Sequence, residues 1–230
     1  MTKKINLTIL FLTIVYSIYC ALQLGYTWDV LYYHEIGKDR LNYLFSLGNN
    51  EVEDKINSHK FITGTYATIS AFFVQIFPRK YTLESLYLIN LFFSILAIFG
   101  IYKVTKELFN KQIGKITFAI CLFNPIFFGH MAMNSVDTII AFALVWSFCI
   151  ILRYLKNQQN KEKRKKYVIY CGLLLGLGLG VRYAFLIIML PIFVFVLFEI
   201  FYYKIFISKS FSKKIFFLDA LKVLLISYLL

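Results

Sequence analysis

Apolar residues along this chain gather into long runs separated by polar segments. These runs cover residues 5–24, 83–102, 116–129, 138–155, 167–203 and 215–230. A helix that crosses a bilayer needs about 20 predominantly apolar residues, so the runs predict membrane-spanning helices. The run over 167–203 is too long for one span, and we expect it to divide near Arg182 into two helices, the first of them short.

Residues 61–77 are apolar but contain Thr, Ser and Gly, and basic residues flank them on both sides. If this segment crossed the bilayer, every later segment would change sides, and the basic cluster at 161–166 would lie outside. The pattern therefore predicts an interfacial helix over 61–77, within an outer loop that covers residues 25–82.

The composition places the chain among integral membrane proteins. Of its 230 residues, 60% are hydrophobic and 19% aromatic, which leaves too little polar surface to cover a soluble globule. We expect an all-α, polytopic transmembrane bundle formed by residues 1–230 as one module. Because the chain stops within an apolar run, it is predicted to be the N-terminal part of a longer protein. Four isolated cysteines indicate neither a disulfide framework nor a metal site.

Charge gives the predicted bundle an orientation. Most of the 25 lysines and arginines fall in the N-terminus and in the segments near 103–115, 153–166 and 204–214, which this topology puts on one side. Cytoplasmic loops carry such an excess. We therefore expect a multi-pass protein of the cell (inner) membrane with a cytoplasmic N-terminus. The net charge of +13 is assigned to orientation and to contact with membrane lipids, with no nucleic acid as partner.

Polar residues interrupt the apolar pattern in "NPIFFGHMAMNSVDTIIAF", residues 124–142. His130, Asn134 and Asp137 would share one face if this segment were helical. Alternatively, they cap the ends of two helices, with Asp137 as the N-cap of the following span. The predicted topology brings Asp29 and Arg182 to the same membrane face, where ionisable groups need partners or water.

Two stretches resemble a family of membrane enzymes. Residues 86–156 contain a span ending in a "Y-x-x-x-x-x-L-F" loop, a span ending at proline, a polar loop reaching Asp137, and a further span ending in arginine. "GLLLGLGLGVRYAFLIIMLP", residues 172–191, is a Gly-rich half-span leading to Arg182. Both resemble the GT-C superfamily of polyprenyl-phosphate-sugar-dependent glycosyltransferases, which includes protein O-mannosyltransferases and aminoarabinose transferases (glycosyltransferase family 39 type).

The resemblance implies roles for particular residues. The family's catalytic aspartate in the first outer loop falls on Asp29, and its acidic residue after the third span falls on Asp137. Val30 stands where many members have a second acid, and "NSVD" replaces "NPKD". The basic residue usual before the interfacial helix falls on Lys60, with His59 beside it.

The expected reaction moves a sugar from a polyprenyl-phosphate donor to a hydroxyl of a lipid, glycan or protein acceptor, without a cofactor. Asp29 would take the acceptor proton. Arg182 and Lys60 would stabilise the departing phosphate, and His130 and Asp137 would orient the site or the acceptor. Direct displacement inverts the anomeric centre. A transporter or flippase for a lipid-linked sugar and a non-catalytic subunit remain alternatives.

Overall fold

The computed structural model describes residues 2–47 and 64–229. Within these residues all regular elements are helices, so the predicted all-α bundle is confirmed. In chain order they are α1 (Thr2–Leu22), α2 (Trp28–Phe45), α4 (Thr65–Val74), η1 (Arg79–Tyr81), α5 (Thr82–Leu108), α6 (Lys111–Phe123), α7 (Pro125–His130), α8 (Ser135–Asn157), α9 (Lys161–Val181), α10 (Phe185–Phe198), η2 (Glu199–Tyr203) and α11 (Lys213–Tyr228).

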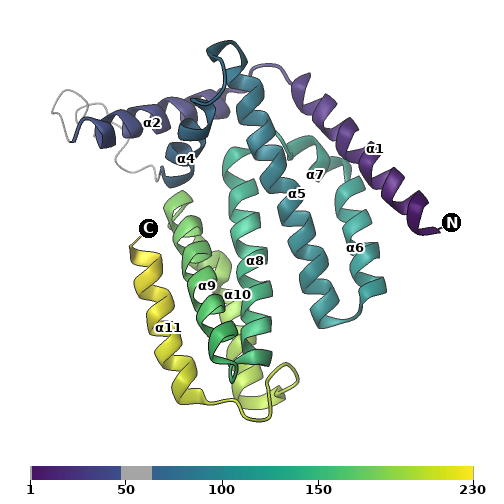
Figure 1. Cartoon of the computed structure of the whole chain (residues 1–230), viewed down its shortest axis with the longest axis vertical. Coiled ribbons are helices and arrows are strands. Elements are labelled where there is room, and N and C mark those ends of the chain that lie inside the picture. Colours follow the sequence, from purple (N-terminus) through teal and green to yellow (C-terminus); the bar gives the residue numbers. More distant parts are fainter. Residues whose placement is uncertain (1, 48–63, 230) are drawn as a thin grey trace.

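The long helices pack side by side and alternate in direction (Figure 1). Helix α8 lies between α5 and α9, and α9 also packs against α11. We call the end of the bundle that carries α2 and α4 the upper end, and the end with the α5–α6 and α8–α9 turns the lower end.

Three segments of the described chain are long and apolar enough to cross a membrane, over Arg79–Leu108, Ser135–Asn157 and Phe185–Tyr203. Together with the composition, they identify a membrane protein. The expected division of the run over 167–203 is confirmed, because α9 ends at Val181 and α10 starts at Phe185. A Cβ on Gly178 would lie 2.4 Å from the ring of Phe185, so glycine lets α10 fold back against α9.

The predicted span over 116–129 is interrupted, which corrects the sequence interpretation. Helix α6 ends at Phe123, and the Asn124 side chain accepts a hydrogen bond of 2.9 Å from the backbone N–H of Phe127. Pro125 then occupies the first turn of α7, where its missing N–H is tolerated. A cap followed by proline therefore starts a separate short helix at the upper end.

The segment between α1 and α5 contains the predicted short helix and one that was not expected. Helix α4 has 10 residues and extends only about 15 Å, half of a bilayer core. It packs against α2, whose Gly37 lies so close to Ala67 that a Cβ would meet the carbonyl oxygen at 2.0 Å. The buried Val30 and Leu41, on the same side of α2 as Gly37, are the sequence signal for this missed helix.

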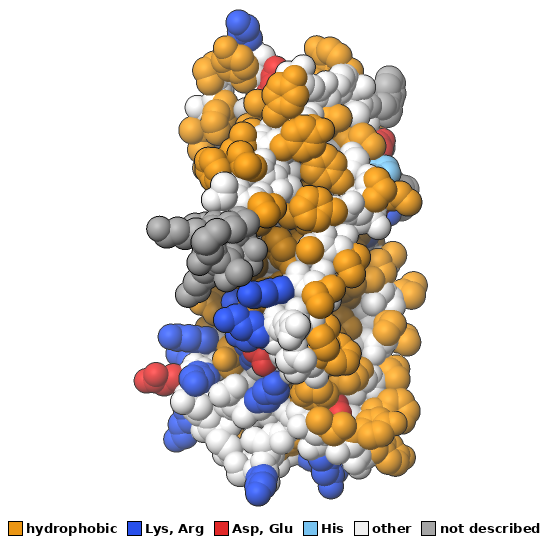
Figure 2. Space-filling model, turned by 90° about the vertical axis from the view of Figure 1, so that its right-hand side faces the viewer, with side chains coloured by type: hydrophobic (Ala, Val, Ile, Leu, Met, Phe, Trp, Pro, Cys, Tyr) orange, Lys and Arg blue, Asp and Glu red, His pale blue; other side chains and the backbone are white. Residues whose placement is uncertain are grey.

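Basic side chains gather at the lower end. Figure 2 shows lysine and arginine over the lower part of one face and mainly hydrophobic side chains above them. Glu107, at the end of α5, lies 2.9 Å from Lys156 and 3.3 Å from Arg153 of α8. This ion-pair cluster joins two helices where the charged part of the bundle begins.

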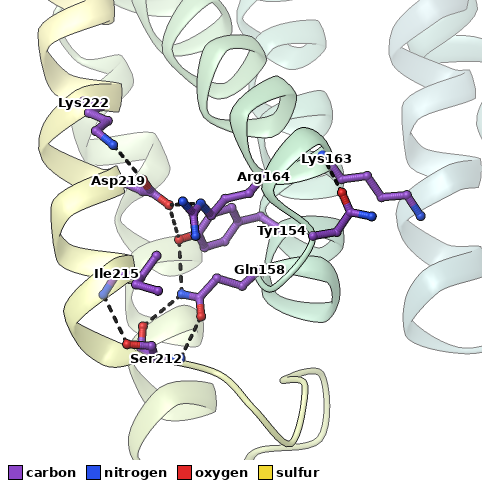
Figure 3. A network of polar contacts seen from close by, with 9 residues as sticks. Tyr154, Gln158, Lys163, Arg164, Ser212, Ile215, Asp219 and Lys222 are labelled. Carbon is purple, nitrogen blue, oxygen red and sulfur yellow. Dashed lines mark hydrogen bonds and ion pairs between the residues drawn. The ribbon is translucent and has the colours of Figure 1, made fainter.

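A second polar network at the lower end fastens α11 to α8 and α9 (Figure 3). The buried carboxylate of Asp219 accepts a hydrogen bond of 2.9 Å from the Tyr154 hydroxyl. Arg164 and Lys222 lie 3.4 and 3.3 Å from its two oxygens. Gln158 extends the network to the backbone at the start of α11, so the last helix is held by polar as well as apolar contacts.

Candidate functional site

Helix α5 positions the segment that leads to Asp29. Tyr87 is fully buried, and its hydroxyl donates a hydrogen bond of 2.7 Å to the carbonyl of Gly25. The same hydroxyl lies 3.0 Å from the side-chain hydroxyl of Thr27. Both partners belong to the connection between α1 and α2, and Asp29 follows in the first turn of α2 with an exposed side chain. Tyr87 thus anchors the backbone that presents this carboxylate.

The same side of α5 holds the connection between α7 and α8. Asn90 donates from Nδ2 to the carbonyl of Ala132 at 2.9 Å, and Ser94 donates from Oγ to the carbonyl of Met131 at 2.7 Å. Both α5 side chains are buried. Since residues three and four apart in a helix are neighbours, one face of α5 carries Tyr87 and these two anchors. It therefore gathers two segments distant in sequence that flank the predicted site residues.

Asn134 is the N-cap of α8. Its Oδ1 accepts a hydrogen bond of 3.0 Å from the backbone N–H of Asp137, and its Nδ2 donates to Oδ2 of Asp137, also at 3.0 Å. His130 ends α7 before this turn, so the segment is not one continuous helix and the condition for a shared face of the three residues is not met. The alternative, that a polar residue of this segment caps the following helix, is correct, but the N-cap of α8 is Asn134 and not Asp137.

Arg182, at the end of α9, forms an ion pair with Asp137, in the first turn of α8. Arg182 caps the C-terminus of α9, and its Nη1 lies 3.4 Å from Oδ1 of Asp137. The arginine and aspartate side chains are 52% and 63% exposed, so both remain accessible to a ligand. The sequence predicted that four ionisable groups lie at one membrane face: Asp29, His130, Asp137 and Arg182. Two of them, Asp137 and Arg182, form a direct ion pair.

The other predicted site residues do not take part in this ion pair or lie outside the described part of the chain. His130 is exposed at the end of α7, immediately before the Met131 carbonyl that Ser94 holds. Asp29 reaches the upper end on a separate helix, and no contact in the described chain joins its carboxylate to the ion pair. His59 and Lys60 lie outside the described residues.

Sequence reasoning missed a second basic side chain near this end. Arg40 of α2 lies against the backbone of Gly64, where a Cβ would be 2.4 Å from its guanidinium carbon. Burial lowers the pKa of Arg40, while Tyr183, which follows Arg182, acts in the opposite direction. The same helix carries His34. Burial lowers the pKa of His34, and the charge of Lys38 lowers it further.

The missed anchors on α5 had a sequence signal. Tyr87, Asn90 and Ser94 are polar residues spaced by three and four within an otherwise apolar span. Such a stripe in a membrane helix faces protein or water, because lipid offers no hydrogen-bond partners. The stripe could have identified the side of α5 that supports the site.

The arrangement puts an exposed carboxylate, Asp29, and an exposed cation, Arg182, at the same end of the bundle. A carboxylate can accept a proton, and an accessible arginine can bind a phosphate, because its planar guanidinium can donate two hydrogen bonds to the phosphate oxygens. The neighbouring carboxylate of Asp137 and its Asn134 cap hold that arginine at the end of α9.

One comparison with known proteins gave a match. The family model described as dolichyl-phosphate-mannose-protein mannosyltransferase matches residues 65–229. The matched region includes Asp137, Arg182 and the anchoring face of α5. No curated protein and no solved structure matches the chain.

Proposed function

Since the chain belongs to the dolichyl-phosphate-mannose-protein mannosyltransferase family and is therefore of the glycosyltransferase type, we propose that it transfers a sugar from a polyprenyl-phosphate donor to an acceptor hydroxyl. The ion pair between Arg182 and Asp137 is the observation that carries the proposal. It places an accessible cation beside a helix end, in a chain whose neighbouring helices are long enough to span a membrane.

In the proposed reaction the acceptor oxygen attacks the anomeric carbon of the sugar. The bond from that carbon to the phosphate oxygen breaks, and its electron pair leaves with the phosphate. The acceptor proton passes to the carboxylate of Asp29. Arg182 stabilises the charge that grows on the phosphate. Attack opposite the leaving group inverts the anomeric centre.

Asp137 and Asn134 are assigned positioning roles in this scheme. Asp137 lies beside the Arg182 guanidinium and is itself held by the amide of Asn134. His130, which is exposed before the same turn, is assigned the role of orienting the acceptor. Because the basic residues gather at the lower end, we assign the upper end to the outer face of the cell membrane and the N-terminus to the cytoplasm.

The test is sugar transfer by the full chain in liposomes, with polyprenyl-phosphate mannose as the first donor. Asp29→Asn keeps the size of the side chain and removes its ability to take a proton, so transfer should fall by about 100-fold or more. Binding of the donor should persist.

Glu35→Gln is the matched control, because it neutralises an exposed carboxylate on the same helix. Its transfer rate should match that of the unmodified chain. Undiminished transfer by Asp29→Asn would refute the assignment of the base. Donor crossing the liposome membrane without any transfer would instead indicate a flippase.

A further inference from the structure

Helix α4 contacts every part of the bundle that carries a residue of the candidate site. It packs against α2, which carries Asp29, and against α9, whose C-cap is Arg182. It also contacts α5, whose anchoring face holds the α7–α8 connection. The short helix therefore links the helix of the proposed base to the two helices that form the ion pair (Figure 1).

The ring of Tyr66, in the first turn of α4, belongs to a buried apolar cluster shared with α8 and α9. The same cluster contains Val136 and Val181. Val136 directly precedes Asp137, and Val181 directly precedes Arg182. A side chain of α4 thus packs in the same cluster as the sequence neighbours of both charged residues.

The hydroxyl of Tyr66 extends this connection to the α7–α8 turn. It donates a hydrogen bond to Oδ1 of Asn90, and Nδ2 of the same amide donates to the carbonyl of Ala132 at 2.9 Å. Tyr66 and Asn90 are both buried, so loss of either bond would leave a polar atom without a partner. Ala132 lies two residues before Asn134, which caps α8 and binds the carboxylate of Asp137.

A close approach between α4 and α9 fixes the other side of the ion pair. A Cβ on Gly180 would lie 2.2 Å from the hydroxyl oxygen of Thr65 and 2.7 Å from its Cβ. Any side chain at residue 180 would therefore push the two helices apart. Gly180 lies in the last turn of α9, two residues before Arg182. The position of α4 consequently determines where the backbone of Arg182 lies.

We propose that α4 positions the Arg182–Asp137 pair for donor binding, with Thr65 and Tyr66 as its positioning residues. This inference rests on the proposed function, which assigns the donor phosphate to Arg182. An exposed ion pair restrains its two side chains only weakly, so their geometry depends on the backbone that carries them. Helix α4 supports that backbone on both sides. A cation held in place before the ligand arrives binds more tightly, because less conformational freedom is lost.

Gly180→Ala tests the contact with α9, in the full chain in liposomes with polyprenyl-phosphate mannose as ligand. The added methyl group should displace Arg182 and lower donor affinity by about tenfold. Thr65→Gly in the same chain removes the atoms that this methyl group meets, so it should restore most of the affinity. In an Arg182→Ala background, Gly180→Ala should cause no further loss, because the displaced cation is absent.

Gly172→Ala is the matched control on the same helix. A Cβ on Gly172 would lie 2.6 Å from Cβ of Ile226 on α11, so this variant disturbs an equally close helix contact. It lies about 15 Å along α9 from Arg182. Its thermal unfolding midpoint should fall as it does in Gly180→Ala, while donor affinity per folded molecule stays at the level of the unmodified chain.

Tyr66→Phe tests the connection to the α7–α8 turn. It leaves the ring in the cluster and removes one hydrogen bond, so donor affinity should fall by about fivefold. Tyr154→Phe is its control, because Tyr154 is also buried and donates to a carboxylate in the lower network, at the other end of the bundle. That variant should keep its donor affinity even if its stability falls as much.

Two results would overturn the positioning role of α4: equal loss of affinity in Gly180→Ala and Gly172→Ala, or unchanged affinity in Tyr66→Phe. The second decides the matter alone if Gly180→Ala does not fold. Failure of the proposed function has a different signature. Donor binding that follows the expected pattern among the variants, without sugar transfer by the unmodified chain, would keep the role of α4 and refute the transferase. Absence of donor binding by the unmodified chain would refute both.

Discussion

The guanidinium of Arg182 lies 3.4 Å from the carboxylate of Asp137, although 45 residues separate them in the sequence. Both side chains are more than half exposed, and exposed ion pairs contribute only about 0–1 kcal/mol to stability. The pair is therefore a weak stabilising contact, and its value lies in placing a cation where α9 ends and α8 begins.

Arg182→Ala should consequently separate stability from function. We expect the thermal unfolding midpoint to change little, while donor binding weakens and turnover falls, because Arg182 would contact the phosphate before and during its departure. Arg182→Lys should restore part of the activity, since it returns the charge without the planar fork. Transfer and donor affinity measured in liposomes check this.

Arg79→Ala provides the comparison for that experiment, because Arg79 is an exposed arginine in η1, directly before α5. Its transfer rate and donor affinity should stay at the level of the unmodified chain. If both alanine variants weakened binding equally, a general electrostatic attraction would explain the effect and Arg182 would have no specific role.

A second prediction concerns the anchor for Asp29. Tyr87→Phe removes the hydroxyl that contacts Gly25 and Thr27, at a cost of about 1 kcal/mol for the lost hydrogen bonding. The α1–α2 connection should then hold the carboxylate less firmly, so kcat should fall while donor affinity is kept. Tyr102→Phe, on the same helix towards the lower end, should change neither quantity. A loss of donor affinity equal to the loss in kcat would contradict a positioning role.

Much of the fold follows from local patterns, and the site follows only in part. Hydropathy predicted the break at Arg182 because a charge within an apolar run must reach an interface. It did not predict α2, whose buried side is short and mixed with polar residues. It also could not pair Asp219 with Tyr154, because that contact depends on how α11 returns to α8.

For the candidate site too, the sequence predicted some features, and others depend on how the helices pack. Sequence position alone brought Asp137 and Arg182 to one end of the bundle, and the structure adds their contact. A shared face of His130, Asn134 and Asp137 required a continuous helix, and the turn between α7 and α8 interrupts it. Asn134 instead caps α8, because its side-chain oxygen accepts a hydrogen bond from the Asp137 backbone N–H, which has no acceptor within the helix.

A third prediction tests the orientation of the bundle. In a variant without the four native cysteines, Asn42→Cys places an exposed thiol on α2 at the upper end, and Lys163→Cys places one on α9 at the lower end. A membrane-impermeant maleimide added to intact cells should label the first and spare the second. Both should react after the membrane is permeabilised. Labelling of Lys163→Cys alone in intact cells would reverse the topology and move the proposed site to the cytoplasmic face.

The last prediction separates the lower network from the site. Asp219→Ala removes a buried carboxylate that accepts from Tyr154 and faces Arg164, so the free energy of unfolding should fall by about 1–3 kcal/mol. Lys222→Ala should cost less than about 1 kcal/mol, because that side chain is 61% exposed. Unfolding in detergent micelles measures both, and equal losses would contradict the central role of the carboxylate. Transfer per folded molecule should be unchanged in each variant, since the network joins α11 to α8 and α9 at the end of the bundle opposite Asp137.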